Sequence, residues 1–354
     1  MRWIAITLLS TLAWTASAAA PHRAPASRLA ASVDSLGADT SFAGVVLVAR
    51  HGVPVVRRAF GDACIEWSQR NVPDGIFPIG SISKQLTALG ILALEQDGRL
   101  SVRDTIARYF PEAPASWRRI TIHQLLTHTS GIPDLVRLPE FGELIRHTVA
   151  LDSLVRLLAS KPLDFEPGSR FLYGNSGYTL AAALIERLTH RPYAEFIAQR
   201  ICRPAGMRST GAWDGRTLVR HMAHGYARRN GVLRLPEALD WSIPLGAGTC
   251  YSSADDLLLL DRALHAGRIV PAEAVGRVLS PYEFGYGYGW YVSGSGGPRI
   301  HEHMGDINGF GAYVTHDLDA DVLVIVLSNV QGTPVQSIAR SLLLAEQIDL
   351  RLAR

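Results

Sequence analysis

Lysine is nearly absent from this chain of 354 residues, although arginine is abundant. Of its 35 Lys and Arg residues, only Lys84 and Lys161 are lysine. Arginine keeps its proton in proteins, whereas lysine can lose its proton when the surroundings lower its pKa. Each of the two lysines is therefore a candidate for a position that needs a removable proton.

Other absences exclude whole classes of function. The formal net charge is only +3 and no run of five or more basic residues occurs, so the sequence predicts no nucleic-acid partner. No G-x-S-x-G pattern occurs, which disfavours a hydrolase of the nucleophile-elbow type. The three cysteines, Cys64, Cys202 and Cys250, form no C-x-x-C pattern. They allow one disulfide but do not indicate which pair would form it.

The first residues have the pattern of a secretory signal peptide. Arg2 precedes an apolar stretch at residues 3–14, and Ala16-Ser17-Ala18 forms an A-x-A cleavage pattern, with residues 18–20 as a second register. The apolar stretch is too short to cross a bilayer comfortably, and no later one reaches about 18 residues. We expect removal of residues 1–18, a periplasmic or secreted protein, and no stable membrane anchor.

Strand patterns lie near both ends of the chain, and helical patterns lie between them. Two β-branched runs, residues 44–50 and 53–60, flank His51-Gly52 and predict a hairpin. Further strands are predicted at residues 286–292, 311–316 and 321–327. Helical periodicity is found at residues 81–97, 122–127, 151–160, 177–189, 193–202, 254–266 and 334–348.

This order of elements predicts a mixed α/β (α+β) domain over residues 19–354. Its α/β part would comprise about residues 21–80 and 271–354, with a sheet assembled from both ends of the chain. Residues 81–270 would form a mostly helical part.

Ser81 and Lys84 stand three residues apart at the start of a predicted helix. This spacing places both side chains on one face, one turn apart. Free backbone N–H groups and the positive end of the helix dipole favour an oxyanion at this end. A serine hydroxyl is a weak nucleophile until a base removes its proton, and a desolvated lysine can be that base. The alternative is a helix-capping serine beside a solvated lysine.

Two further clusters could complete such a site. Tyr173 could relay protons and Asn175 could hold a lysine or a substrate amide, although both could simply begin the helix at residues 177–189. In the segment His303-Met304-Gly305-Asp306, the glycine would let a substrate backbone approach closely. The N–H of Asp306 could complete an oxyanion hole.

Two histidine patterns raise the alternative of a metal site. His301 and His303 would share one face of a strand around Glu302, and His221 and His224 stand three residues apart. No third ligand follows His301 and His303 at a recognised spacing, and Arg220 and Arg228 near the second pair discourage a cation. We therefore expect no metal and no cofactor.

Together the clusters resemble the serine β-lactamase and penicillin-binding-protein superfamily. The closer resemblance is to the branch, peptidase family S12, that holds class C β-lactamases, DD-carboxypeptidases, D-aminopeptidases and esterases. The motifs follow the order of the family: S-x-x-K at Ser81–Lys84, Y-x-N at Tyr173–Asn175, and H-x-G at His303–Gly305 where K-T-G is usual. The resemblance extends from about residue 40 to the C-terminal helix.

The resemblance implies an antiparallel sheet of the five-stranded type flanked by terminal helices, a mostly helical domain, and a cleft with Ser81 at its floor. It implies that Ser81 forms an acyl-enzyme and that Lys84 and Tyr173 share the proton transfers, in an order left open. Asn175 would orient the substrate and Lys84. The backbone N–H groups of Ser81 and Asp306 would hold the oxyanion.

The third motif departs from the pattern of the family, and this bears on the substrate. His303 stands where a lysine is usual, so permanent positive charge is lost at neutral pH. Met304 replaces a hydroxyl residue that would bind a substrate carboxylate, and Arg299 either compensates or faces solvent. His303 and Gly305 would still border the substrate. The sequence therefore favours an ester, an amide or a D-amino-acid peptide, and the partner is a small molecule or peptide, cell-wall fragments included.

Two other functions stay open. A true class C-like β-lactamase or a DD-carboxypeptidase would use the same nucleophile. A binding module that senses cell-wall fragments without turnover belongs to another class, and the complete set of Ser81, Lys84 and Tyr173 argues against it. Lys161 precedes Pro162 in a loop and is expected at the surface.

Overall fold

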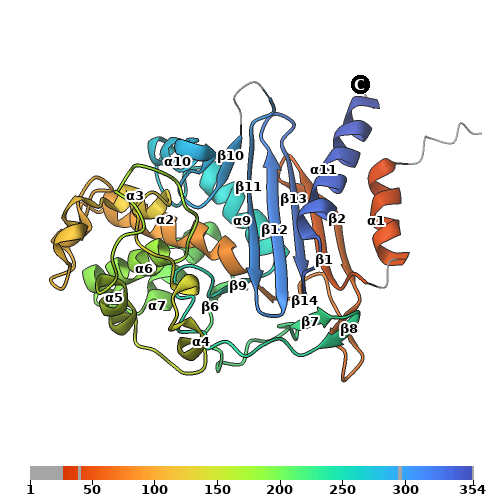
Figure 1. Cartoon of the computed structure of the whole chain (residues 1–354). Helices are drawn as coiled ribbons and strands as arrows, with labels where there is room; N and C mark the ends of the chain where they lie inside the picture. The colour runs from red at the N-terminus through yellow and green to blue at the C-terminus, as the bar shows by residue number, and fades with distance from the viewer. Residues whose placement is uncertain (1–26, 39–40, 294–296, 353–354) are drawn as a thin grey trace, which may run out of the picture.

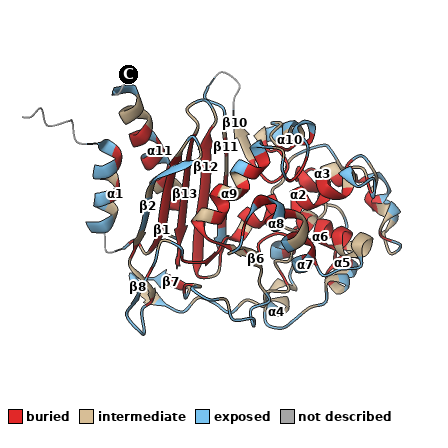
Figure 2. Ribbon diagram, turned by 180° about the vertical axis from the view of Figure 1, so that it is seen from behind, coloured by how far each residue is buried: buried red, intermediate tan, exposed pale blue. Residues whose placement is uncertain are grey.

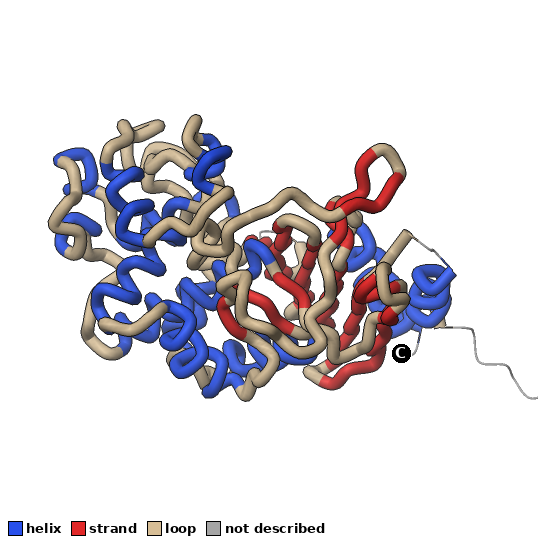
Figure 3. Tube along the Cα trace, turned by 90° about the horizontal axis from the view of Figure 1, so that it is seen from below, coloured by secondary structure: helices blue, strands red, loops and turns tan. Residues whose placement is uncertain are grey.

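The sheet and most of the helices occupy different sides of the molecule (Figure 1). The structure is a computed structural model that describes residues 27–38, 41–293 and 297–352, so the expected signal peptide at residues 1–18 lies outside the described residues. The main sheet has six antiparallel strands in the order β10-β11-β12-β13-β1-β2. Seen from below, strands and most helices again separate into two groups (Figure 3).

The elements have the following bounds. The main sheet consists of β1 (Gly44–Arg50), β2 (Val53–Phe60), β10 (Tyr291–Ser293), β11 (Ile300–Ile307), β12 (Phe310–Asp317) and β13 (Val322–Ser328). The α-helices are α1 (Arg28–Ala38), α2 (Ser83–Gln96), α3 (Ile122–Leu126), α4 (Phe141–Leu144), α5 (Leu151–Ala159), α6 (Ser176–Thr189), α7 (Tyr193–Ile197), α8 (Arg203–Ala205), α9 (Ala254–His265), α10 (Ala272–Val278) and α11 (Val335–Leu352). Shorter strands form three small sheets: β3 (Asp62–Cys64) with β4 (Gln69–Arg70); β5 (Phe77–Pro78), β9 (Cys250–Ser252) and β6 (Gly211–Ala212); and β14 (Val330–Gln331), β7 (Tyr226–Arg229) and β8 (Val232–Arg234).

The middle of the main sheet is buried on both faces (Figure 2). Every residue of β13 is buried. Because side chains alternate along a strand, Val322, Val324 and Val326 belong to the core under α1 and α11. The intervening residues of β13 belong to the core that includes α2 and α6. Two covered faces explain why this strand is hydrophobic at almost every position instead of at alternate ones.

The two terminal helices pack together on one face of the sheet (Figure 1). The Asp349 carboxylate near the end of α11 accepts hydrogen bonds from the backbone N–H groups of Arg28 and Leu29, both at 3.0 Å. These are N–H groups of the first turn of α1, which have no partner within their own helix. The C-terminal helix therefore caps the N-terminal one. No described helix is both long enough and apolar enough to cross a membrane.

Most of the predicted elements are present. The hairpin at residues 44–60 and the mixed fold are confirmed, and the sheet has one short strand, β10, beyond the expected five. The region at residues 81–270 is not purely helical, because β6 to β9 interrupt it. These strands are two to four residues long, too short to give a recognisable alternating pattern.

The strand predicted at residues 286–292 was wrong over most of its length. It begins only at Tyr291. The N–H of Gly287 donates to the Trp290 carbonyl at 2.7 Å, which closes a turn. Gly289 has a φ of +90°, and a Cβ built on it would lie 3.0 Å from the Gln85 Cα. The alternation of tyrosine and glycine has the two-residue period of a strand, which explains the wrong prediction. The glycines instead let the chain turn where it packs against the start of α2.

One close backbone contact joins the sheet to the turn that carries Ser81. This turn is the 3₁₀ segment η1 (Gly80–Ile82), which runs directly into α2. Gly80 has a φ of +48°, and a Cβ on it would lie 2.8 Å from the Asp306 backbone nitrogen. A Cβ on Gly305 would lie 1.9 Å from the Ile79 carbonyl oxygen. The sequence analysis placed a substrate backbone against Gly305, but the backbone that approaches it is that of Ile79.

We expect Gly305→Ala to lower the free energy of unfolding by about 1–3 kcal/mol, because overpacking forces β11 or η1 to move. Denaturant unfolding measures this change. Gly276→Ala is the matched control, since its Cβ would meet nothing within 4 Å and it lies within α10. That variant should be neutral or slightly more stable. Equal stability of wild type and Gly305→Ala would contradict the proposed constraint.

Candidate active site

Ser81 and Lys84 meet at the start of α2. The Lys84 Nζ lies 2.9 Å from the Ser81 Oγ, as their three-residue spacing predicts. Ser81 lies in η1 and is partly exposed, whereas Lys84 is in the first turn of α2 and is fully buried. The Ser83 Oγ donates to the Gly80 carbonyl at 2.6 Å and accepts from the Cys250 N–H at 2.9 Å, which fixes the turn against β9.

The Lys84 amine has three hydrogen-bond acceptors, none of which is a carboxylate. Besides Ser81, these are the Asn175 Oδ1 at 2.9 Å and the Ala247 carbonyl oxygen at 3.0 Å. Burial disfavours the charged ammonium and lowers the pKa of Lys84 to about 7, against an opposing effect of the Asp134 charge. Lys84 is therefore substantially unprotonated at neutral pH and can accept a proton from Ser81.

A hydrogen bond with Asp134 fixes the backbone of Asn175. The Asp134 Oδ1 accepts a hydrogen bond from the Asn175 backbone N–H at 2.9 Å. Asn175 directly precedes α6, and the Ser176 Oγ accepts from the Leu135 N–H at 2.9 Å. These two bonds join the loop before α6 to the segment around Asp134. They place the Asn175 amide oxygen where Lys84 can donate to it.

Tyr173 closes the other side of the site. Its ring centroid lies 4.9 Å from the Lys84 Nζ. Burial raises the pKa of Tyr173 well above that of an exposed tyrosine, and an interaction with the Ser81 side chain partly offsets this shift. The phenol is therefore protonated at neutral pH and can donate a proton but is a poor base.

His303 lies on the buried face of β11 and is uncharged. It is only 2% exposed, and its Nε2 lies 2.9 Å from the Tyr286 hydroxyl. Burial and the nearby Lys84 lower the pKa of His303 to about 3. The expected loss of positive charge at this position therefore follows from its surroundings. Neighbouring Met304 points its side chain outward and is 47% exposed.

Aromatic rings surround Tyr173 and His303. Tyr173 stacks on Tyr291 with ring centroids 6.4 Å apart, and Tyr291 lies 5.5 Å from the ring of His303. His128 lies 4.4 Å from the ring of Tyr173 and is 5% exposed. Other rings continue this wall: Phe171, Phe284 and Tyr286. The wall is largely apolar and carries no formal charge at neutral pH.

Sequence reasoning missed several members of this site. The Ala247 carbonyl is a backbone group, which no residue pattern identifies. Asp134, His128 and Tyr286 act through tertiary contacts with residues that lie 41, 46 and 17 positions away in the sequence. The clearest available signal was the Tyr286-Gly-Tyr-Gly-Trp segment, which the sequence analysis assigned to a strand.

Other candidates lie elsewhere. Arg299 forms an ion pair with Asp319 at 2.7 Å and its side chain is 66% exposed, so it faces solvent. Lys161 pairs with Glu140 near the surface. The three cysteines are all buried and unpaired.

The two histidine patterns do not form metal sites of their own. His303 bonds Tyr286, and Glu302 pairs with Arg340 at 2.7 Å. His221 lies 3.7 Å from Asp74 instead of facing His224.

Comparison with known proteins decides the family. The Beta-lactamase family model matches residues 29–347. The chain belongs to this family. It is 31% identical over 318 residues to a penicillin-binding protein from Bacillus subtilis, which covers 84% of this chain and 70% of that relative. It is 32% identical over 291 residues to Esterase EstB from Burkholderia gladioli, which covers 70% of this chain and 71% of the esterase.

The solved structures agree with this assignment. A D-stereospecific amidohydrolase from Streptomyces sp. is 27% identical, has a TM-score of 0.76, and the match covers 88% of this chain and 97% of that chain. The protein is thus a β-lactamase-like serine hydrolase, and its mixed α/β fold is that of the family.

Because the chain has only two lysines, lysine labelled with ¹³C should give two signals in an NMR spectrum. We expect the Lys84 signal, assigned by its loss in Lys84→Arg, to titrate near pH 7. In Asp134→Asn, the loss of a negative charge that raises this pKa should move the titration to lower pH.

Asp319→Asn is the control for this experiment. Asp319 pairs with Arg299 at the surface, so its replacement should leave the Lys84 titration unchanged. A Lys84 signal that titrates near the ordinary value of about 10.4, or an upward shift in Asp134→Asn, would contradict the assigned environment.

Proposed function

We propose that this hydrolase forms an acyl-enzyme at Ser81 and acts on an uncharged ester or amide, D-amino-acid amides and peptides included. The observation that carries the proposal is the buried Lys84, whose amine contacts the Ser81 hydroxyl and whose pKa is lowered to about 7. The motif S-x-x-K, by itself weak, gains a physical meaning from this environment. A base with a pKa near the working pH is the most effective proton acceptor.

In the proposed acylation, unprotonated Lys84 takes the proton of Ser81 while the Ser81 Oγ attacks the substrate carbonyl. The raised pKa of Tyr173 makes it unsuited to be the first base. Its phenol instead donates a proton to the leaving amine or alkoxide and recovers one from protonated Lys84. The carbon–leaving-group bond breaks, and the acyl group stays on Ser81. Water then hydrolyses the ester by the same proton transfers in reverse order.

The oxyanion of the tetrahedral intermediate would be held by the backbone N–H groups of Ser81 and Asp306. The close packing of Gly80 and Gly305 supports this role, because it brings the Asp306 nitrogen next to the turn that carries Ser81. Asn175 would orient Lys84 and the amide of a substrate. His303 and Gly305 border this region on β11.

Two features of the site favour an uncharged substrate. His303 is neutral, and Met304 has no hydroxyl, so the third motif offers no cation or hydroxyl to a carboxylate. The aromatic wall around Tyr173 favours an apolar group near the reacting carbonyl. Two relatives are named for the proposed types of bond: Esterase EstB for an ester, and the D-stereospecific amidohydrolase for an amide.

A β-lactamase or DD-carboxypeptidase is the second candidate, and one residue favours it. Arg137 is exposed, and its guanidinium donates to the Tyr173 carbonyl oxygen at 3.4 Å. It could therefore pair with the carboxylate of a β-lactam or of a peptide terminus.

For either candidate we propose a periplasmic or secreted location and a small-molecule or peptide substrate. The signal-like residues 1–18 support export.

The two lysines provide a matched test of the mechanism. Lys84→Arg should lower kcat/KM by at least about 10³-fold, because arginine keeps the charge but cannot accept the proton. Lys161→Arg should keep nearly full activity, since Lys161 only pairs with Glu140. Ester hydrolysis measures both effects. Near-normal activity of Lys84→Arg would overturn the assigned role.

The nucleophile is tested by covalent labelling with a fluorophosphonate followed by peptide mapping. We expect the label on Ser81 in the wild type and none in Ser81→Ala. Equal labelling of both proteins would refute the acyl-enzyme at Ser81. A label that forms but no product from any substrate would instead support the binding-module alternative.

A substrate panel separates the two candidate functions. We expect p-nitrophenyl esters and D-amino-acid amides to be hydrolysed with kcat/KM at least about 10²-fold above that for nitrocefin. Nitrocefin carries a carboxylate, and the lack of a charge-assisted contact to it costs about this factor. The Arg137→Ala variant is measured in parallel. Preferred turnover of nitrocefin, with a raised KM in Arg137→Ala, would favour the β-lactamase.

A further inference from the structure

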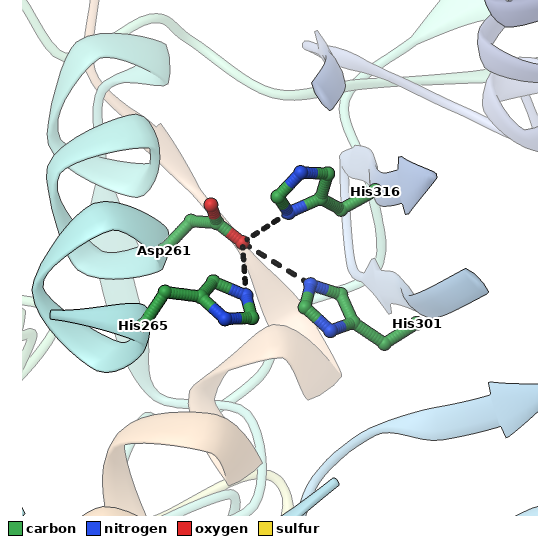
Figure 4. A group of neighbouring side chains, drawn as sticks. All are labelled: Asp261, His265, His301 and His316. Atoms are coloured by element: carbon green, nitrogen blue, oxygen red, sulfur yellow. Dashed lines mark hydrogen bonds and ion pairs between the residues drawn. The ribbon is translucent and has the colours of Figure 1, made fainter. Parts of the chain in front are cut away.

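Three histidines and an aspartate meet on the sheet beside α9 (Figure 4). Asp261 and His265 lie one turn apart at the end of α9, His301 lies on β11, and His316 lies on β12. His301 and His316 face each other as paired residues of neighbouring strands. One ligand atom from each of the four residues lies within 4.8 Å of all the others.

We propose that this group, the Asp261 site, binds a zinc ion. Its ligands would be one carboxylate oxygen of Asp261, the Nε2 atoms of His265 and His301, and the Nδ1 of His316. Three imidazole nitrogens and one carboxylate oxygen are typical zinc donors in tetrahedral sites. Neither the family assignment nor the serine chemistry at Ser81 requires this ion.

The distances within the Asp261 site fit a tetrahedral ion. The Asp261 Oδ1 lies 3.7 Å from the His265 Nε2, 3.1 Å from the His301 Nε2 and 3.0 Å from the His316 Nδ1. Zinc bonds of about 2.0–2.1 Å at tetrahedral angles place neighbouring donors about 3.3 Å apart. The three distances to Asp261 lie on both sides of this value, and the remaining pairs of ligand atoms lie within 4.8 Å of each other.

The orientation of His316 provides an independent argument. Its Nδ1 points to the centre of the site, and its Nε2 lies 3.2 Å from the Asp321 Oδ1. Histidines that bind metals commonly donate their second N–H to a carboxylate, which fixes the ring and makes the ligand more basic. His301 differs, because its Nδ1 is buried without a hydrogen-bond partner among the described residues. Asp321 thus supports one ligand of the site.

The rings also converge without blocking the centre. His265 and His301 lie parallel, with ring centroids 5.2 Å apart and an interplanar angle of 12°. His316 stands nearly perpendicular to both, at 5.4 and 5.1 Å. Figure 4 shows the three rings directing a nitrogen toward the same Asp261 oxygen.

An ion can reach this site from solvent. A cavity of about 600 Å³ is lined by His265, His301 and His316, with Arg299 and Leu279 among its other walls. The His265 side chain is 31% exposed, whereas those of Asp261 and His301 are 11% and 1% exposed. His265 is therefore the member of the site through which solvent has the most access. A bound ion would connect the end of α9 to β11 two residues from His303.

A second group of possible ligands provides the matched control. Cys64, Glu66 and His224 also lie within ligand distance of one another, but Glu66 and His224 are exposed. Glu66 already accepts hydrogen bonds from Cys64 and Tyr226. Zinc held by this second group would be lost in His224→Ala and retained in His265→Ala.

The test uses the complete, untagged protein with zinc alone as the probe. After equilibration with micromolar Zn²⁺ and removal of free ion, elemental analysis should find about one zinc per chain in the wild type and in His224→Ala, and little in His265→Ala. Zn²⁺ should also raise Tm of the wild type by several degrees, because an ion that binds only the folded state stabilises it. His265→Ala should lack this rise.

Several outcomes would overturn the proposal. They are the absence of zinc from the wild type, its loss in His224→Ala but not in His265→Ala, or an unchanged Tm with Zn²⁺. His265 is partly exposed at a helix end, so its replacement should not prevent folding. The Tm of His265→Ala without zinc verifies this point. If that variant does not fold, Co²⁺ bound to the wild type must give the intense visible absorption of a tetrahedral site, and a weak octahedral spectrum would refute the proposal.

Discussion

Burial of one amine dominates the chemistry of this protein. Lys84 is fully buried, and its hydrogen bonds go to a hydroxyl, an amide and a backbone carbonyl. A contacting carboxylate would stabilise the ammonium and keep the proton in place. Asp134 bonds the backbone of Asn175 and does not contact the amine itself. The effect of burial is therefore larger than that of the Asp134 charge, and the pKa of Lys84 falls to about 7. The same arrangement keeps Tyr173 and His303 uncharged. The site is therefore a nearly neutral region, and in the proposed mechanism one proton moves between its groups.

The geometry around this amine depends on backbone contacts as much as on side chains. Two glycines, Gly80 against the backbone of Asp306 and Gly305 against the backbone of Ile79, let β11 approach η1 more closely than a Cβ would permit. The Ser83 hydroxyl then fixes the same turn to β9. A short, rigid support of this kind would hold Ser81 with the accuracy that the proposed acyl transfer needs.

The spacing and alternation of residues along the sequence predicted those features that depend only on neighbouring residues. The spacing of Ser81 and Lys84 was sufficient to place them together, and the alternation and length of residues 44–60 predicted a hairpin. Resemblance to a family supplied Tyr173 and Asn175, which the residues alone would have left in a turn. The Ala247 carbonyl, Asp134 and Tyr286 could not be predicted, because each contributes through contacts that only the folded chain creates. The Asp261 site combines both cases: Asp261 and His265 stand four residues apart on α9, whereas His301 on β11 and His316 on β12 are brought to them only by folding.

The position of β1 has a consequence for how the protein is made. Residues 44–50 lie between β2 and β13, so this strand is completed only when residues 322–328 are available. Strands that are far apart in the sequence pair slowly, because closing the long loop between them costs entropy before the new contacts offset that cost. The Asp306 N–H that borders Ser81 also arrives late in synthesis. A ribosome-bound chain would therefore carry Ser81 and Lys84 but lack the strand beside them, and the proposed hydrolytic activity would begin only after the C-terminal segment has joined the sheet.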